Sequence, residues 1–338
     1  MQSPPFDGTL FGVLDNGSPV YSYQISDGIV SMTVITFGAI ITSLRVPSHN
    51  GILDIVLGFD TLDDYIAAHG LPAPPYFGAL VGRYAGRISG GQFMLGTALH
   101  KLPHNDNGNT LHGGTSGFDR ALWNVTDKGE NYIEMKHVSP DGDQGFPGEL
   151  TVSVRYTIAN QVVEIDIEAT TTADCPVNLT QHSYFNLDGH DADIRNQLLK
   201  INSSRLLETD AQHIPTGNLL PPAEKQMDYS TGGHPYFGID DDFVVNDTAS
   251  VAAVLQSDVT GIRMEIMSNQ PSLHVYVGGN LFGRFTGKAG AKYHHHSGIA
   301  FESQFFPDAP NRPAFPSTIL KQGELYKHQT LWKFTTEP

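Results

Sequence analysis

The residues best suited to chemistry begin with a histidine in the stretch Pro176-Val-Asn-Leu-Thr-Gln-His-Ser-Tyr-Phe-Asn-Leu-Asp-Gly189. Apolar and polar residues alternate along its first half and it ends on an Asp-Gly turn signal, which is typical of a strand running into a turn. Alternate side chains of a strand share one side. The residues predicted to share the histidine's side are Thr180, His182, Tyr184 and Asn186. A hydroxyl, an imidazole, a phenol and an amide suit a polyhydroxylated ligand, although a core histidine satisfied by local hydrogen bonds also explains His182.

A lone carboxylate, Glu302, stands in the apolar stretch Gly298-Ile-Ala-Phe-Glu-Ser-Gln-Phe-Phe-Pro-Asp-Ala-Pro-Asn311. This stretch predicts a strand that runs into a proline-rich loop. A charged group on such a strand needs partners, or its pKa rises. Glu302 is therefore either half of a buried structural ion pair or a general base, and the surrounding residues favour the general base.

Glycine-rich segments carry two arginines and a further histidine. Gly82-Arg-Tyr-Ala-Gly-Arg-Ile88 places Arg83 and Arg87 four residues apart, each after a glycine that permits close backbone approach or a positive φ. Such an arginine can present a planar fork of donors to ligand oxygens, or can pair on the surface with one of the many acids. The loop Asn105–Gly114 holds His112 directly before two glycines, a pattern often found where an imidazole faces a cleft.

Two more segments offer polar side chains on strands. In Ser272-Leu-His-Val-Tyr-Val277 the apolar residues face one way, which leaves His274 and Tyr276 opposite. In Gly238-Ile-Asp-Asp-Asp-Phe243 three acids stand together, Asp240 first. Acid runs are usually solvated, but this one could also supply a carboxylate to a metal or to sugar hydroxyls.

The tract Tyr293-His-His-His-Ser297 has the composition of a metal site but not its spacing. Neighbouring side chains on an extended segment point apart, so at most His294 and His296 could converge. No H-E-x-x-H or H-x-x-E-H pattern accompanies the tract. We therefore predict that the chain has no metal site.

The pattern of apolar residues predicts an all-β fold. Period-two alternation is clearest in Val163–Ala169, where Val, Ile and Ile alternate with Glu, Asp and Glu. Helical periodicity is scarce, and Asp60–Ile66, capped by Asp60 or Thr61, is one of few helix candidates. No linker is long, polar and charge-shifted enough to divide the 338 residues, so we expect one domain over residues 1–338.

Charge and composition narrow the function classes. A formal net charge of −16 argues against nucleic acid or an anionic membrane as a partner. The single cysteine, Cys175, excludes an intrachain disulfide. The first residues, Met1-Gln-Ser-Pro-Pro-Phe6, lack the features of a signal peptide, and no apolar run approaches the ~20 residues of a membrane span. These features predict a cytoplasmic protein, and they leave open whether it is a monomer or a dimer.

Five of these segments together resemble the aldose 1-epimerase (galactose mutarotase) family, in the family's order and over most of the chain. They are Gly82–Ile88, Asn109–Gly114, Asn178–Leu187, Gly238–Asp240 and Gly298–Asn311. The resemblance implies a supersandwich of large antiparallel sheets with the sugar in an open cleft. It also implies a reaction without cofactors that interconverts the α- and β-anomers of an aldose such as galactose or glucose.

The resemblance further implies roles for individual residues. Glu302 matches the base that takes the anomeric hydroxyl proton, His182 matches the acid that protonates the ring oxygen, and His112 matches a second histidine that assists there. Arg87 and Asp240 match residues that bind sugar hydroxyls.

Two positions depart from the family pattern. Gly86 stands where many members have asparagine, and His274, a further candidate for substrate binding, stands where the animal enzyme has glutamine. A Glu–His pair suits the reaction, because opening a hemiacetal needs a base near O1 and an acid near O5, and the two roles exchange when the ring closes.

Three alternatives stay open at this point. A hexose-phosphate mutarotase of the same fold would need a basic cluster for the phosphate, and the chain offers only Arg83, Arg87 and scattered lysines. A non-catalytic sugar-binding protein would be marked by loss of Glu302 or His182, and both are present. A metal-dependent lyase or hydrolase would need a carboxylate–metal site that the strands do not supply. We therefore predict that the substrate is an unphosphorylated aldohexose.

Overall fold

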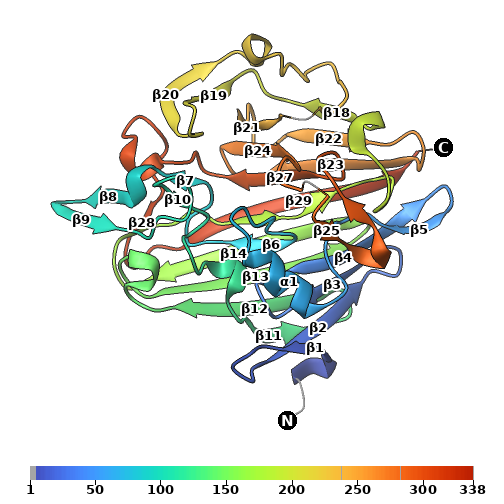
Figure 1. Cartoon of the computed structure of the whole chain (residues 1–338), viewed down its shortest axis with the longest axis horizontal. Coiled ribbons are helices and arrows are strands. Elements are labelled where there is room, and N and C mark those ends of the chain that lie inside the picture. Colours follow the sequence, from blue (N-terminus) through green and yellow to red (C-terminus); the bar gives the residue numbers. More distant parts are fainter. Residues whose placement is uncertain (1–4, 237, 282, 338) are drawn as a thin grey trace.

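Three antiparallel sheets hold most of the strand residues in the computed structural model, which describes residues 5–236, 238–281 and 283–337 (Figure 1). The eight-stranded sheet has the order β11 (Asn124–Lys128), β12 (Tyr132–Ser139), β13 (Leu150–Ala159), β14 (Val162–Thr171), β29 (Tyr326–Thr336), β23 (Ile262–Ser268), β22 (Ala253–Gln256) and β18 (Leu198–Ile201). The six-stranded sheet has the order β17 (Tyr184–Phe185), β27 (Ile299–Gln304), β24 (Ser272–Val277), β21 (Asp240–Val244), β19 (Leu206–Thr209) and β20 (Pro215–Leu220). The five-stranded sheet runs from β1 (Thr9–Val13) through β2 (Pro19–Ser26), β3 (Ser31–Ile35) and β4 (Ile41–Ser48) to β5 (Gly51–Asp54).

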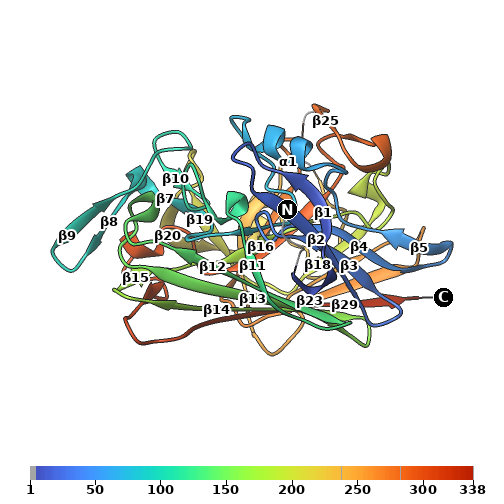
Figure 2. The ribbon, with the colours of Figure 1, turned by 90° about the horizontal axis from the view of Figure 1, so that it is seen from below.

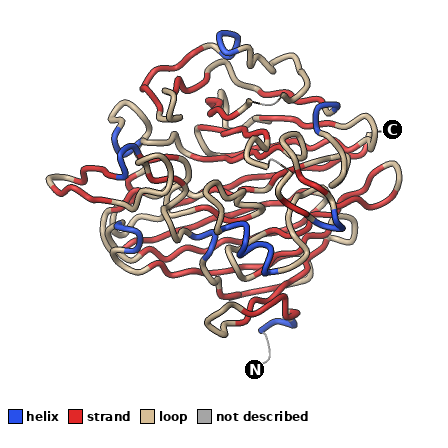
Figure 3. Tube along the Cα trace, in the orientation of Figure 1, coloured by secondary structure: helices blue, strands red, loops and turns tan. Residues whose placement is uncertain are grey.

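Short strand pairs and helices make up the rest of the regular structure (Figure 3). The pairs are β6 (Ala79–Val81) with β16 (Thr180–His182), β7 (Arg87–Ile88) with β10 (Thr110–Leu111), β8 (Gln92–Leu95) with β9 (Ala98–Lys101), β15 (Cys175–Pro176) with β28 (Ile319–Leu320), and β25 (Phe285–Thr286) with β26 (Lys292–Tyr293). The helices are α1 (Leu62–His69) and the short 3-10 helices Pro5–Asp7, Ser89–Gly91, Phe118–Arg120, Asp143–Gly145, Ile194–Asn196, Pro222–Lys225, Lys288–Gly290 and Ala309–Asn311. The prediction of an all-β supersandwich with few short helices is confirmed.

The alternation predicted for Val163–Ala169 appears as strand β14 of the eight-stranded sheet. Its apolar side chains Val163, Ile165 and Ile167 are buried, and the acidic side chains between them lie toward solvent. Both neighbouring strands pair with β14 over most of its length. Each fully buried aliphatic side chain contributes roughly 1.5–3 kcal/mol, which fixes this strand's register.

The sheets share one hydrophobic core. A single cluster of buried side chains reaches from Tyr23 on β2 to Phe334 on β29 and includes residues of all three large sheets. Figure 2 shows the eight-stranded sheet as a broad layer on one side, with α1 and β25 on the opposite side. The expectation that residues 1–338 form one domain stays a prediction.

Helix α1 begins where its sequence predicts. Thr61 is the N-cap, and its hydroxyl accepts a hydrogen bond from the backbone N–H of Asp64 at 3.2 Å. The helix is only eight residues long. Across the part of the chain that the structure describes, no helix combines the length and the apolar character needed to span a membrane.

Candidate active site

Strand β27 places Glu302 in the middle of the six-stranded sheet. All six residues of this strand are buried, and Glu302 is only 1 % exposed. Directly opposite Glu302 on β24 lies His274, and directly opposite His274 on β21 lies Asp242. Since cross-strand neighbours present their side chains on the same face, the sheet itself sets up a row of ionisable groups.

His182 comes from β16 and faces the same space as Glu302. Hydrogen bonding between the Thr180 hydroxyl and the Ser303 carbonyl, at 2.9 Å, holds β16 against β27. The chain then changes partner at Ser183, because β16 pairs with β6 whereas β17 pairs with β27. The strand predicted over the whole stretch is therefore broken.

That break decides which predicted residues meet in one place. His182 and Tyr184 line the same cleft, with ring centroids 5.2 Å apart. Thr180 and Asn186 do not line it. The Asn186 side chain instead donates to the carbonyls of Ala192 and Ser297.

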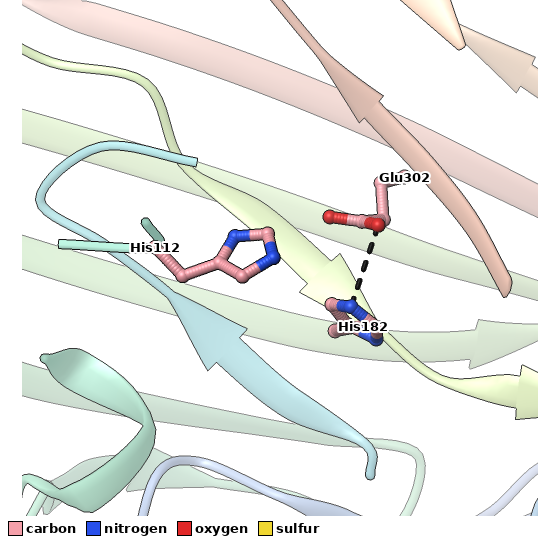
Figure 4. A group of neighbouring side chains, drawn as sticks. All are labelled: His112, His182 and Glu302. Atoms are coloured by element: carbon pink, nitrogen blue, oxygen red, sulfur yellow. Dashed lines mark ion pairs between the residues drawn. The ribbon is translucent and has the colours of Figure 1, made fainter. Parts of the chain in front are cut away.

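The two predicted catalytic groups lie next to each other. His182 Nε2 is 3.4 Å from Glu302 Oε1, and both side chains are almost fully buried (Figure 4). The other polar atom of each group, His182 Nδ1 and Glu302 Oε2, is buried with no hydrogen-bond partner in the described structure. Buried polar atoms are nearly always paired, so this site keeps unmet capacity for a polar ligand.

His112 completes a trio with His182 and Glu302. It has a left-handed backbone conformation (φ 51°), and its ring centroid lies 5.4 Å from that of His182. The backbone N–H of Gly86 donates to His112 Nδ1 at 3.3 Å, so the proton of the neutral ring sits on Nε2. Figure 4 shows this outer nitrogen turned toward the other two side chains. Burial, together with the charges of His182 and Arg87, holds the pKa of His112 well below its usual value and keeps the ring neutral.

The trio opens into a cleft of about 330 Å³. This volume lies at the lower end of the range typical for small-molecule sites, roughly 300–1,000 Å³. Three tyrosines provide aromatic walls and the polar groups converge between them. The lining residues include Tyr76, Arg87, Asp106, His112, Arg120, His182, Tyr184, His213, Asp240, Asp242, His274, Tyr276, Glu302 and Gln304.

The two arginines of the glycine-rich segment have different places. Arg87 lines the cleft and its Nε lies 2.6 Å from Asp106 Oδ2. Arg83 is 2 % exposed and donates to Ser139 and to three further backbone carbonyls of residues 140–148. Neither sequence interpretation holds for Arg83, because it binds backbone oxygens of a loop and reaches neither a ligand nor a surface acid.

Asp240 and His274, both predicted to bind substrate, are in contact at the cleft wall. His274 Nε2 lies 3.2 Å from Asp240 Oδ1, and His274 Nδ1 lies 3.1 Å from Asp242 Oδ2. Burial alone would raise the pKa of Asp240, but the hydrogen bond and charge of His274 outweigh it and lower that pKa to about 2. Asp240 is therefore ionised at neutral pH.

Within the described residues, the trio is also the one group with ligand atoms close enough to suggest a metal. Its three atoms lie within 4.8 Å of one another. Tetrahedral zinc at 2.0–2.1 Å from its ligands places neighbouring ligand atoms about 3.3 Å apart, so the trio would have to contract around an ion. The nitrogen that His112 turns inward also carries its proton. The tract His294–His296 is not part of this group.

Comparison with known proteins identifies the family of this site. The sequence profile described as Aldose 1-epimerase matches residues 21–333. The chain is 37% identical to the galactose mutarotase of Mus musculus over 340 residues, covering 97% of this chain and 98% of that protein. It is 35% identical to the aldose 1-epimerase of Haemophilus influenzae, covering 88% and 90% of the two chains. The chain belongs to the aldose 1-epimerase family.

Solved structures agree with this membership. The GalM/aldose epimerase homologue from C. elegans superimposes with a TM-score of 0.87 at 27% identity, covering 94% of this chain and 99% of that one. The galactose 1-epimerase from Lactobacillus acidophilus shares the fold, with a TM-score of 0.84 at 23% identity over 98% and 99% of the chains. The resemblance read from the five segments is confirmed, and the protein is an isomerase of this family.

Within this aldose 1-epimerase, the departure at Gly86 has a structural counterpart. Gly86 has φ +77°, and a Cβ there would lie 2.9 Å from Cγ of Pro307. An asparagine at this position would require Pro307, which lines the same cleft, to move. The position of Pro307 in the cleft wall therefore requires a residue without a side chain at position 86.

Sequence reasoning missed several residues of the site. Asp106 and Tyr76 line the cleft from loops and Arg120 lines it from the short 3-10 helix Phe118–Arg120, and none of these segments has a periodic pattern. Asp242 could have been found, since it stands two residues after Asp240 and must share its face on a strand. Its role depends on the pairing of β21 with β24, which the sequence does not reveal.

Proposed function

We propose that this enzyme interconverts the α- and β-anomers of an unphosphorylated aldohexose, galactose or glucose, through acid–base opening and closing of the ring. The observation that carries the proposal is the buried Glu302–His182 pair at 3.4 Å, in which each residue has one polar atom without a hydrogen-bond partner and lines a sugar-sized cleft. The names of relatives over nearly the whole chain, galactose mutarotase and aldose 1-epimerase, support the same substrate class.

In the proposed reaction, Glu302 takes the proton of the anomeric hydroxyl while His182 gives a proton to the ring oxygen. The C1–O5 bond breaks, and C1 becomes an aldehyde with a free hydroxyl on C5. Rotation about the C1–C2 bond presents the other carbonyl face. His182 then takes the proton from the C5 hydroxyl, the ring closes, and Glu302 returns its proton to O1, so that no net proton is gained or lost.

The neighbouring groups have supporting roles in this proposal. The Nε2–H of neutral His112 donates a hydrogen bond near the ring oxygen, and Arg87 and Asp240 bind sugar hydroxyls. One acid and one base complete the reaction, so we propose that it needs neither metal nor nucleotide. Activity that is unchanged after EDTA treatment would agree with this part, and loss of activity that Zn²⁺ restores would contradict it.

The charges of the cleft favour a neutral sugar over a sugar phosphate. Both arginines that line the cleft already have carboxylate partners, Arg87 with Asp106 at 2.6 Å and Arg120 with Asp119 at 3.3 Å. A phosphate needs unengaged cationic donors, and a chain with a net charge of −16 repels a dianion.

The experiment is a polarimetric or NMR anomerisation assay on galactose, glucose, xylose and glucose 6-phosphate. It uses weak buffer because buffer ions speed the background reaction. We expect catalysis of the free hexoses to exceed that of glucose 6-phosphate. Faster turnover of glucose 6-phosphate would identify a hexose-phosphate mutarotase, and sugar binding without catalysis would identify a non-catalytic sugar-binding protein.

A further inference from the structure

A row of ionisable side chains crosses three neighbouring strands beside the proposed base. Asp242 on β21, His274 on β24 and Glu302 on β27 are direct cross-strand partners, with β24 in the middle (Figure 1). Partners of this kind have Cβ atoms roughly 4.5–5.5 Å apart. Asp240, two residues before Asp242 on the same strand, shares this face.

His274 lies between two of these carboxylates. Its Nε2 is 3.2 Å from Asp240 Oδ1 and its Nδ1 is 3.1 Å from Asp242 Oδ2. A neutral imidazole donates from one nitrogen only and accepts at the other. Ionised carboxylates accept and do not donate, so both nitrogens of His274 must carry protons for both contacts to be attractive. The Nδ1 contact with Asp242 is an ion-pair contact without hydrogen-bond geometry, and two short carboxylate contacts on one ring favour an imidazolium.

The surroundings keep both aspartates in place. Asp242 is 4 % exposed and accepts further hydrogen bonds from Ser272 Oγ at 3.2 Å and Gln304 Nε2 at 3.0 Å. The second oxygen of Asp240 lies 3.5 Å from His213 Nδ1. Asp242 is thus fixed by the sheet, whereas Asp240 stands at the cleft with its orientation set by histidines.

The charges around His274 act in the same direction. Carboxylates face it from β21 (Asp240 and Asp242) and from β27 (Glu302). The Arg87 side chain and the neutral ring of His112 line the same cleft. Burial alone would lower the pKa of His274, but Asp242, Asp240 and Glu302 together raise it well above its usual value. The Arg87 charge is shared with Asp106.

We infer that His274 is a positioning residue, a permanently protonated imidazole that orients the carboxylate of Asp240 toward the sugar hydroxyls. Its positive charge also balances part of the negative charge of Asp240, Asp242 and Glu302. This inference rests on the proposed function, since it takes Asp240 as a sugar-binding group. Both nitrogens of His274 lie within 3.2 Å of aspartate oxygens, so it acts on the sugar through Asp240 in place of the direct contact predicted from the sequence.

The first test follows the ring of His274 by NMR, in protein labelled with ¹³C-histidine and without any sugar. The variant His274→Gln identifies the resonance by its disappearance. We expect a chemical shift typical of imidazolium that stays constant from pH 5 to pH 8. His328, a buried neutral histidine, serves as the internal control with the opposite signature. A His274 resonance that titrates with a midpoint near the ordinary value of about 6.5 would overturn the inference.

A second variant checks the cause of the charge. Asp242→Asn removes one carboxylate from the row but keeps the shape and one acceptor. With one negative charge fewer beside it, His274 should lose its proton more easily. We therefore expect its resonance to change from the imidazolium to the neutral position at a lower pH than in the wild type. An unchanged titration curve in folded Asp242→Asn would contradict the role of this carboxylate.

The kinetic test separates positioning from a structural role. In His274→Gln, Asp240 loses the hydrogen bond and charge that lower its pKa, so it takes up a proton at higher pH. Between pH 8 and pH 4.5 we expect KM for the free hexose to rise about fourfold in the variant and to stay within twofold in the wild type. We also expect kcat at pH 8 to fall less than tenfold.

The outcomes distinguish this inference from the proposed function. A variant that is merely less stable, with the same pH dependence of KM as the wild type, would contradict the positioning role while leaving the anomerisation proposal intact. A wild type that does not anomerise free hexoses would instead overturn the proposed function, and the NMR titration would still report the charge of His274.

Discussion

Two buried histidines on different strands have opposite hydrogen-bond environments. His328 on β29 and His182 on β16 are each 3 % exposed. His328 Nδ1 lies 2.9 Å from the Leu179 carbonyl and its Nε2 lies 2.9 Å from Thr330 Oγ1, so both nitrogens are satisfied by the protein. His182 has one nitrogen facing Glu302 and the other without a hydrogen-bond partner.

The difference shows what separates a structural histidine from one available for chemistry. Two equally buried histidines can have different roles, because the role depends on whether the protein already supplies hydrogen-bond partners for both ring nitrogens. Burial lowers the pKa of His328 to about 4, so the fold keeps it neutral and bonded. His182 Nδ1 and Glu302 Oε2 have no hydrogen-bond partner in the described structure, so a bound substrate can form hydrogen bonds with them.

The largest expected difference is in activity. His182→Asn removes the proposed acid, and general acid–base groups typically contribute ~10²–10⁴-fold, so we expect kcat to fall at least about 100-fold. The matched variant His328→Asn is expected to keep kcat within a few-fold of the wild type. Polarimetry on both purified, folded variants measures kcat. Equal losses of kcat in the two variants would contradict the distinction between a catalytic His182 and a structural His328.

The next expected effect is on stability against pH. The pKa of His328 is lowered to about 4 in the folded state, whereas in the unfolded chain it is near 6.5. Between these values the unfolded chain binds the extra proton, so the stabilisation is complete above pH 6.5 and is lost as pH falls toward 4. The contribution is about 3 kcal/mol over this window.

Urea unfolding at pH 7.5 and pH 4.5 measures this contribution. We expect the free energy of unfolding of His328→Gln to fall less over this interval than that of the wild type, because glutamine does not titrate. An equal fall in the free energy of unfolding in both proteins would show that His328 does not cause the loss of stability at low pH.

The smallest expected effect is the stability change at pH 8. His328→Asn cannot satisfy both the Leu179 carbonyl and Thr330, so it should lose about 1–2 kcal/mol of unfolding free energy. His182→Asn should lose less than His328→Asn, because only the Nε2 of His182, which contacts Glu302, has a partner to lose and its Nδ1 has none. Chemical denaturation of both variants checks the order, and a larger loss in His182→Asn would point to a structural role for that residue.

The sequence predicted the local parts of this structure well. Alternation gave the faces of β14, capping chemistry gave the start of α1 at Thr61, and the isolation of Glu302 in an apolar strand singled it out. These features depend on neighbours along the chain, so they are visible without the fold. The roles of the site residues came from the family resemblance and stay proposals.

The features that the sequence could not predict depend on pairing between strands and contacts between residues far apart in the chain. The change of strand partner at Ser183 separates Thr180 and Asn186 from the cleft, and only the sheet order brings His274 between Asp242 and Glu302. Arg83 looks like Arg87 in sequence, yet it binds carbonyls more than fifty residues away. Such contacts are fixed by tertiary packing, which overrides local pattern.

The most direct test of the proposed mechanism is the kcat of Glu302→Gln, measured by polarimetry in weak buffer beside the wild type. Glutamine is nearly isosteric and cannot accept the anomeric proton. We predict a fall of at least about 100-fold in kcat, with KM changed far less because Arg87 and Asp240 still bind the sugar. A folded Glu302→Gln that keeps nearly full activity would contradict the assignment of Glu302 as the base.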